Sequence, residues 1–170
     1  RKTVGRDIRL VTEFSTPATG AFAGRTRAFL KIQDGCDSFC SYCVVPYARG
    51  KSRSLPGKDV LERIQAIGQA GHRELVLTGI NLGGYGRDLH PASELLDLLR
   101  QVVEIKQLPR LRLSSLEPLE ITAALLAFIR DREIFCRHFH IPLQSGDDGI
   151  LASMGRGYDG AFFRGLVRKI

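Results

Sequence analysis

Short apolar runs alternate along the chain with stretches in which apolar residues recur every three or four positions. Short runs are typical of buried strands, and helical spacing is typical of helices that pack one face on a core. The predicted strands are residues 28–32, 74–79, 110–115 and 138–143. The predicted helices are residues 60–70, residues 95–105, residues 121–129 and two short helices before Ile170. A strand followed by a helix, four times over, predicts an α/β fold with parallel strands and right-handed crossovers.

The unusual sequence follows directly after the predicted strands. A cysteine-rich loop at 34–50 follows the first strand, residues 79–81 the second, 114–117 the third and 144–146 the fourth. A doubly wound sheet and a βα barrel both fit this order, and in both folds ligands bind at the carboxyl ends of the strands. We therefore expect these four loops to form one composite site.

The chain is long enough for one domain. It has 170 residues, of which 44% are hydrophobic, as in an ordinary soluble domain. We expect residues 1–24 to be a linker or N-terminal extension, with a short edge strand at 8–14 and a turn at 16–20, and residues 25–170 to be the core domain. The first residue is not methionine and the last helical pattern has no cap. We therefore expect both ends to be cut from a longer protein, so that the core domain is truncated at its C-terminal end.

Charge and cysteine usage indicate the environment. The formal net charge is +7 and the pI is near 9.6, with the basic excess concentrated in residues 1–58. Such an excess attracts nucleic acid at long range, although a solvated face is the commoner explanation. No signal peptide and no apolar run of membrane length is visible, and the four cysteines are clustered rather than paired. We expect a cytoplasmic protein with no membrane segment and no disulfide bonds.

Cys36, Cys40 and Cys43 form the pattern C-x3-C-x2-C, with no histidine or fourth cysteine nearby. A structural zinc ion takes four ligands in a closed set. A [4Fe–4S] cluster held by only three thiolates keeps one iron open to a cofactor or substrate. The spacing therefore favours an iron-sulfur cluster with a chemical role. A zinc site completed from elsewhere and three buried apolar cysteines are the alternatives.

At these residues the sequence resembles the radical S-adenosylmethionine (SAM) enzymes, with Tyr42 as the aromatic residue of their cysteine motif. The resemblance implies that the open iron chelates SAM and that an electron from the cluster cleaves SAM to a 5′-deoxyadenosyl radical. It also implies a partial TIM barrel of six βα units. The order predicted above supplies about four of the six.

Four blocks covering most of residues 28–160 resemble the radical SAM methylthiotransferases. They are KIQDGC through RGKSR at 31–53, VLTGINLGGYG at 76–86, RLSSLEP at 112–118, and HIPLQSG at 140–146 with Met154 and Arg156 beyond. This resemblance implies insertion of sulfur and a methyl group at an unactivated C–H bond, with a flavodoxin-like or ferredoxin-like electron donor. It also implies a second [4Fe–4S] cluster in an N-terminal domain and an RNA-binding C-terminal domain, neither of which is in this chain.

Within that family, the blocks at 76–86 and 112–118 resemble the branch that modifies N6-threonylcarbamoyladenosine beside the tRNA anticodon. Asn81 departs from the histidine common in that branch. The branches that act on N6-isopentenyladenosine in tRNA and on a ribosomal protein are the alternatives. A non-catalytic iron-sulfur or zinc module that binds RNA is an alternative of another class.

The resemblance also implies roles for individual residues. The expected cluster ligands are Cys36, Cys40 and Cys43; the expected SAM contacts are Tyr42, Gly79, Asn81, Ser115, Glu117 and Gln144; and the expected RNA contacts are Arg49, Lys51 and Arg53. Structural roles are the alternatives: a tight turn at Gly79, a helix cap at Ser115 or Glu117, and a loop hydrogen bond at Gln144. No catalytic side chain is assigned.

Other reactive residues fit structural roles better. Cys136 stands beside a predicted strand, where a buried free thiol is the commoner case. His138 and His140 share one strand face and are expected to be satisfied by hydrogen bonds, while His72 and His90 belong to surface loops.

Overall fold

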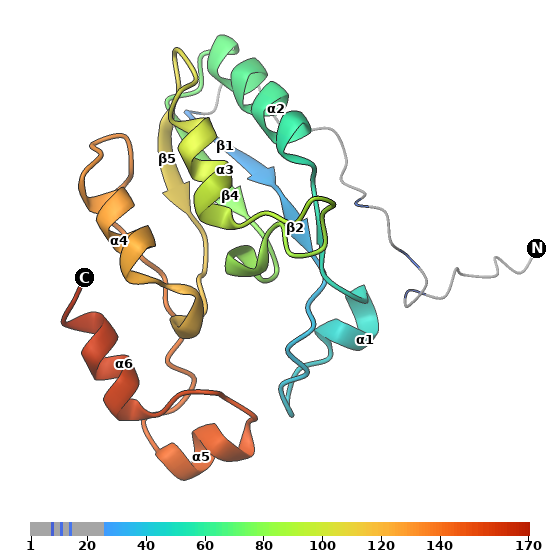
Figure 1. The fold of residues 1–170 in the computed structure, drawn as a ribbon, viewed down its shortest axis with the longest axis vertical. Coiled ribbons are helices and arrows are strands. Elements are labelled where there is room, and N and C mark those ends of the chain that lie inside the picture. Colours follow the sequence, from blue (N-terminus) through green and yellow to red (C-terminus); the bar gives the residue numbers. More distant parts are fainter. Residues whose placement is uncertain (1–7, 9–10, 12–13, 15–25) are drawn as a thin grey trace, which may run out of the picture.

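The computed structural model describes residues 8, 11, 14 and 26–170 of the chain (Figure 1). The predicted linker at 1–24, with its edge strand and its turn, lies outside these residues apart from Ile8, Val11 and Phe14.

A three-stranded parallel sheet forms the centre of the described part. β1 (Arg27–Lys31), β4 (Glu74–Thr78) and β5 (Arg110–Leu113) pair in the order β1-β4-β5. The register aligns Phe29 with Val76 and Val76 with Arg112. The first three predicted strands are confirmed, and so is the α/β class with parallel strands.

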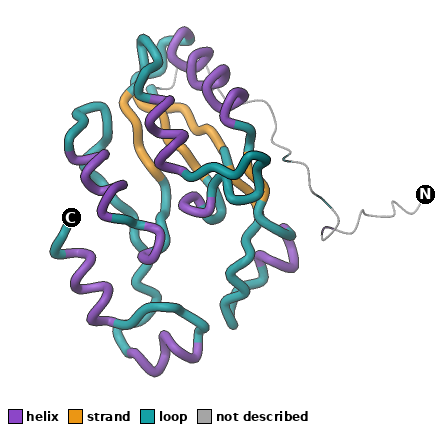
Figure 2. The backbone as a smooth tube through the Cα atoms, in the orientation of Figure 1, coloured by secondary structure: helices purple, strands orange, loops and turns teal. Residues whose placement is uncertain are grey.

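The helices that precede or follow the strands along the chain each bury one apolar face. α2 (Gly57–Gln69) precedes β4, α3 (Leu95–Val102) precedes β5, and α4 (Ala123–Arg130) follows β5. The core joins sheet residues Leu30, Leu75, Leu77 and Leu111 to helix residues Val60, Ile64, Ile67, Leu98, Leu99, Leu125 and Ile129. α2 and α3 lie side by side (Figure 2). Three consecutive residues of β4 are buried, as in a central strand that is covered on both faces.

The predicted fourth strand, residues 138–143, is wrong. The segment 134–140 runs parallel to β5 and to the residues that follow it, but it pairs with them only through two isolated bridges. These bridges join Leu111 to Phe135 and Ser115 to His140. The bridge positions are four residues apart on one side and five on the other, so one extra residue interrupts the ladder as in a bulge. There the amide of His138 bonds to the carbonyl of Cys136 at 2.7 Å. The segment occupies the place of a fourth strand without forming one.

Several short elements surround the carboxyl ends of the strands. The two predicted C-terminal helices are confirmed as α5 (Asp148–Ser153) and α6 (Gly160–Val167), each capped by an aspartate side chain. Five elements were not predicted: β2 (Gln33–Asp34), α1 (Val45–Arg49), β3 (Arg53–Ser54), and the 3₁₀ turns η2 (Leu82–Gly84) and η3 (Pro118–Glu120). Within the described residues no helix has both the length and the apolar character needed to cross a membrane.

Candidate functional site

The cysteine loop, defined here as residues 35–52, is closed at its base by a small antiparallel ladder. In this ladder Gln33 of β2 lies opposite Ser54 of β3, and Asp34 lies opposite Arg53. The amide of Cys36 also donates to the carbonyl of Gly50 at 3.1 Å. Gly35 has φ 72°, and a Cβ there would lie 2.0 Å from the carbonyl oxygen of Lys51. Only glycine therefore allows the two ends of the loop to approach this closely.

Gln33 is buried and its side chain joins the loop to the next strand end. Its Nε2 donates to the carbonyls of Asp34 and Gly35 and to Ser52 Oγ, at distances between 2.8 and 3.0 Å. Its Oε1 accepts from the amide of Asn81 at 2.7 Å, just beyond β4. A buried amide with all these partners fixes the position of both loops.

Asp34 and Arg53 form a buried charged pair beneath the loop. Arg53 Nη2 lies 3.7 Å from Asp34 Oδ2, and the same guanidinium donates to the carbonyls of Arg49 and Lys51. Burial opposes ionisation of Asp34, but hydrogen bonds from Lys31 and Gly35 and the nearby cations outweigh it, so the pKa of Asp34 lies below its ordinary value. Arg53 thus closes the loop, and its guanidinium does not face solvent.

The three motif cysteines are free thiols on this loop, each half-buried. Among residues 8, 11, 14 and 26–170, no three His, Cys, Asp or Glu side chains are arranged to hold one metal ion. The thiolates of a cluster each bind a different iron, so they stand farther apart than ligands that share one ion. The donor set of three thiols fits a cluster and does not form a mononuclear site.

Arg156 connects the cysteine loop to the loop after β5, and sequence reasoning missed this role. Its buried Nη1 donates to Cys40 Sγ at 3.3 Å and to Tyr42 Oη at 3.4 Å. Its Nη2 forms an ion pair with Glu117. Burial raises the pKa of Tyr42, and the charge of Arg156 opposes that rise. Cys40 precedes Arg156 by 116 positions, so no local pattern indicated the contact; only its place in the fourth block pointed to it.

Glu117 and Ser115 do not serve as side-chain caps. Glu117 stands at the N-cap of η3, but its carboxylate makes no cap bond. Ser115 Oγ lies 2.6 Å from Nδ1 of His140. That hydrogen bond agrees with the expectation that His140 is satisfied structurally. The structure therefore places Glu117 with Tyr42 and Cys40, and Ser115 with the segment beside β5.

Gly79 and Asn81 pack inward at the end of β4. A Cβ on Gly79 would lie 2.9 Å from Gln33 Oε1, so close approach to Gln33 explains the glycine. Burial raises the pKa of Glu120, and Arg87 and the nearby Asn81 side chain oppose that rise. Asn81 Oδ1 is buried without a partner among the described residues.

The remaining candidates lie at the surface. Gln144 is exposed with φ 70°. Arg49 and Lys51 are exposed on the cysteine loop, as are the rings of Phe39 and Tyr47, which meet edge to face at 5.8 Å.

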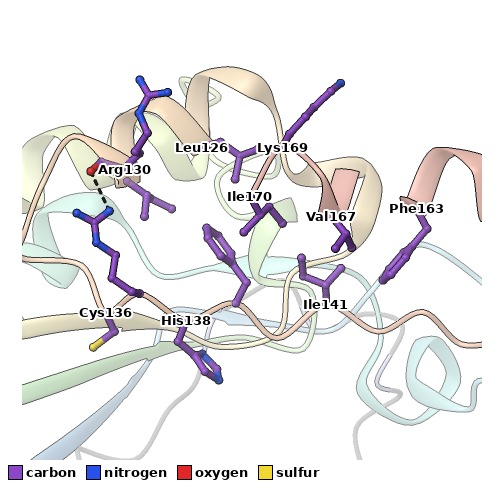
Figure 3. A pocket seen from close by; sticks show the side chains of 12 residues that line it. Leu126, Arg130, Cys136, His138, Ile141, Phe163, Val167, Lys169 and Ile170 are labelled. Carbon is purple, nitrogen blue, oxygen red and sulfur yellow. Dashed lines mark hydrogen bonds between the residues drawn. The ribbon is translucent and has the colours of Figure 1, made fainter. Parts of the chain in front are cut away.

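Cys136 is a buried free thiol, as predicted, and it donates to Glu74 Oε2 at 3.7 Å. It lines a groove of about 470 Å³ between α4, α6 and the segment beside β5 (Figure 3). His138 also lines this groove. His72 is half-buried and His90 is exposed, both in loops as expected. The groove that Cys136 and His138 line includes no residue of the cysteine loop.

Comparison with known proteins identifies the family. The family model of the radical SAM superfamily matches residues 30–170. The chain belongs to the radical SAM superfamily. Membership implies a [4Fe–4S] cluster and SAM as cofactors, and the cysteine loop is the part of this radical SAM chain whose donor set fits such a cluster.

Curated relatives carry the names of two tRNA-modifying enzymes. The chain is 38% identical over 162 residues to the threonylcarbamoyladenosine tRNA methylthiotransferase MtaB of Bacillus subtilis, covering 95% of this chain and 35% of the relative. It is 39% identical over 145 residues to the tRNA-2-methylthio-N(6)-dimethylallyladenosine synthase of Clostridium tetani, covering 85% of this chain and 32% of the relative. The radical SAM chain thus spans about a third of the length of these relatives.

Solved structures share the fold. The radical SAM methyltransferase TsrM of Kitasatospora setae, with cobalamin and a [4Fe-4S] cluster bound, superposes with a TM-score of 0.67 at 19% identity, covering 83% of this chain and 28% of that one. The parallel order β1-β4-β5 is therefore part of a radical SAM partial barrel, as predicted.

The close approach at Gly35 generates a stability prediction. Gly35→Ala should lower the free energy of unfolding by about 3 kcal/mol or more, because it adds both a positive-φ side chain and a clash with the Lys51 carbonyl. Gly71→Ala is the matched control, since Gly71 has φ 81° but open space around a Cβ. It should cost only the backbone term, about 1–2 kcal/mol. Urea unfolding of both variants measures the difference, and equal losses would contradict the close approach.

Proposed function

We propose that this chain is the SAM-cleaving core of a tRNA methylthiotransferase that adds a 2-methylthio group to N6-threonylcarbamoyladenosine next to the anticodon. The observation that carries the proposal is the set of three free thiols on one loop at the carboxyl end of a radical SAM sheet. The names of the curated relatives support the methylthio chemistry and the tRNA substrate.

Cys36, Cys40 and Cys43 would hold the cluster as thiolates. When bound, the cluster supplies the electron that cleaves SAM. Gln33 keeps the loop in place from below, and its bond to the Asn81 amide sets the distance between the cysteine loop and the end of β4.

The SAM contacts come from the loops at the strand ends. The Glu117 side chain is 34% exposed, so one carboxylate oxygen can accept from the SAM amino group or a ribose hydroxyl while Arg156 holds the other. Ser115 and Gln144 offer a hydroxyl and an amide in the loops that follow β5 and the segment beside it, and Tyr42 borders the cysteines. Asn81 and Gly79 would shape the SAM site by setting the path of the backbone after β4, because the Asn81 side chain lies near Glu120 and Gly79 packs against Gln33.

The proposed RNA contacts lie on the cysteine loop itself. Arg49 and Lys51 are exposed and can meet phosphates, and the exposed rings of Phe39, Tyr42 and Tyr47 can stack on bases. Arg53 is left out of this surface, because its guanidinium is buried among carbonyls. A second [4Fe–4S] cluster, an electron donor of the flavodoxin or ferredoxin type and an RNA-binding domain complete the proposed enzyme outside this chain.

The second candidate substrate is N6-dimethylallyladenosine, which the name of the Clostridium tetani relative favours at nearly equal identity. The blocks at 76–86 and 112–118 favour the threonylcarbamoyl substrate, because they resemble that branch.

Cluster ligation is tested by single alanine variants. Cys36→Ala, Cys40→Ala and Cys43→Ala should each abolish production of 5′-deoxyadenosine from SAM after anaerobic reconstitution, because an iron loses its protein ligand. Cys136→Ala is the matched control and should keep both iron content and SAM cleavage, since Cys136 lies outside the loop. Iron loss on changing Cys136, or stoichiometric zinc without any SAM cleavage in the unchanged protein, would refute this assignment.

The substrate is tested in cells that lack the full-length gene. Mass spectrometry of tRNA nucleosides should show loss of 2-methylthio-N6-threonylcarbamoyladenosine and accumulation of its precursor without the methylthio group. A plasmid carrying the gene should restore the modification, and a plasmid carrying the Cys40→Ala gene should not. Loss of the methylthio group from the dimethylallyl nucleoside instead would select the second candidate.

A further inference from the structure

Arg156 is a buried cation whose partners are poorly matched to its charge when the cysteines are thiols. Its side chain is only 6% exposed, and Glu117 supplies one countercharge. Its other two partners are both bound by Nη1. They are the thiol sulfur of Cys40 and the phenol oxygen of Tyr42. Neutral sulfur is a weak acceptor, and a buried guanidinium is costly unless its donors are well satisfied. A thiolate at Cys40 would satisfy the same donor far better.

The chain directs Arg156 to this place through the end of α5. Gly155 has φ 73°, and its amide donates to the Ala152 carbonyl at 3.0 Å. The amide of Arg156 donates to the Leu151 carbonyl, also at 3.0 Å. These two bonds and the left-handed glycine form a Schellman motif, which turns the chain sharply after the helix. The turn aims the Arg156 side chain back at the cysteine loop.

The end of α5 is also fixed directly to the cysteine loop. The amide of Ser41 donates to the Met154 carbonyl at 3.2 Å, and Ser41 Oγ donates to the Ser153 carbonyl at 2.9 Å. The guanidinium carbon of Arg156 lies 5.2 Å from the centre of the Tyr158 ring, which covers it. The position of Arg156 beside Cys40 is therefore held by both segments and shielded from water.

We propose that Arg156 is a positioning residue that keeps an N–H···S hydrogen bond to the Cys40 sulfur in the cluster-loaded protein and thereby raises the reduction potential of the cluster. Reduction adds one electron, supplied by dithionite in the test below, and takes the cluster from the 2+ to the 1+ state without a proton. Hydrogen bonds and positive charge at the cluster sulfurs stabilise the more negative reduced state. This inference rests on the proposed function, because it requires the cluster.

The test is a redox titration followed by EPR on the anaerobically reconstituted protein, without tRNA. Arg156→Met should shift the ratio of reduced to oxidised cluster at least tenfold toward the oxidised form, which is about 59 mV for one electron. Arg156→Lys keeps the charge but loses the planar fork, so it should shift less. Arg168→Met is the matched control, because Arg168 is exposed at the end of α6, and it should leave the potential unchanged.

The double variant Arg156→Met with Glu117→Gln separates two effects. It removes the carboxylate that Arg156→Met alone would leave unpaired, so a shift toward the oxidised form that persists cannot come from that carboxylate and reflects the loss of Arg156. Unchanged potentials in Arg156→Met and in the double variant, with full iron content, would overturn the proposal.

Pulsed EPR of the unchanged protein tests the bond even if the variants lose the cluster. Unchanged protein labelled with [15N]arginine should show a weak 15N coupling to the reduced cluster. The coupling should disappear in labelled Arg156→Lys wherever that variant holds the cluster. A labelled protein with a reduced cluster and no 15N coupling refutes the proposal. Failure of the unchanged protein to hold any cluster would refute the proposed function instead.

Discussion

The buried side chain of Gln33 is the interaction on which the geometry of the site depends. One amide group donates to the start of the cysteine loop and to Ser52 at its end, and it accepts from the backbone amide of Asn81, just after β4. A buried amide that lost one of these partners would pay a desolvation cost with nothing to replace it. Gln33 therefore couples the cysteine loop to the end of β4, a connection that the separate two-residue ladder of β2 and β3 does not make.

A layer of buried charge surrounds this amide. Asp34 pairs with both Arg53 and Lys31 under the loop, and Arg53 also donates to two loop carbonyls. Beside Cys40, Arg156 and Glu117 form a second charged pair. The cysteine loop is thus held by two sets of charged contacts, while most of the apolar core consists of leucine, isoleucine and valine side chains. Such an arrangement fixes the loop without closing access to the thiols, which are half-buried.

The sequence predicts the parts of this molecule that depend on local pattern. The apolar runs of β1, β4 and β5 and the helical periodicity of α2 to α4 are properties of neighbouring residues, and they are confirmed. The fourth strand failed because a one-residue bulge between the bridges at Phe135 and His140 leaves no mark on the apolar pattern. A register slip of one residue is visible only once the partner strand is known.

The polar site was only partly predictable for a related reason. The cysteine motif is local, so its spacing could be read directly. The partners of Gln33 and Arg156 lie up to 116 positions away, and no spacing rule connects them. Arg53 shows the reverse case, because its place after the motif suggested an RNA contact. In the structure Arg53 is buried, and its guanidinium donates to the carbonyl of Arg49 four positions earlier, which is a structural role.

The most direct measurement is electron-nuclear double resonance on the reduced, reconstituted protein with SAM labelled with 15N at its amino group. The account predicts a strong 15N coupling, because three cysteine ligands leave one iron to bind the amino and carboxylate groups of SAM. The coupling should be absent from protein without SAM. A reduced cluster whose spectrum does not change on adding SAM would contradict the account, since the cysteine loop would then hold a cluster with no open iron.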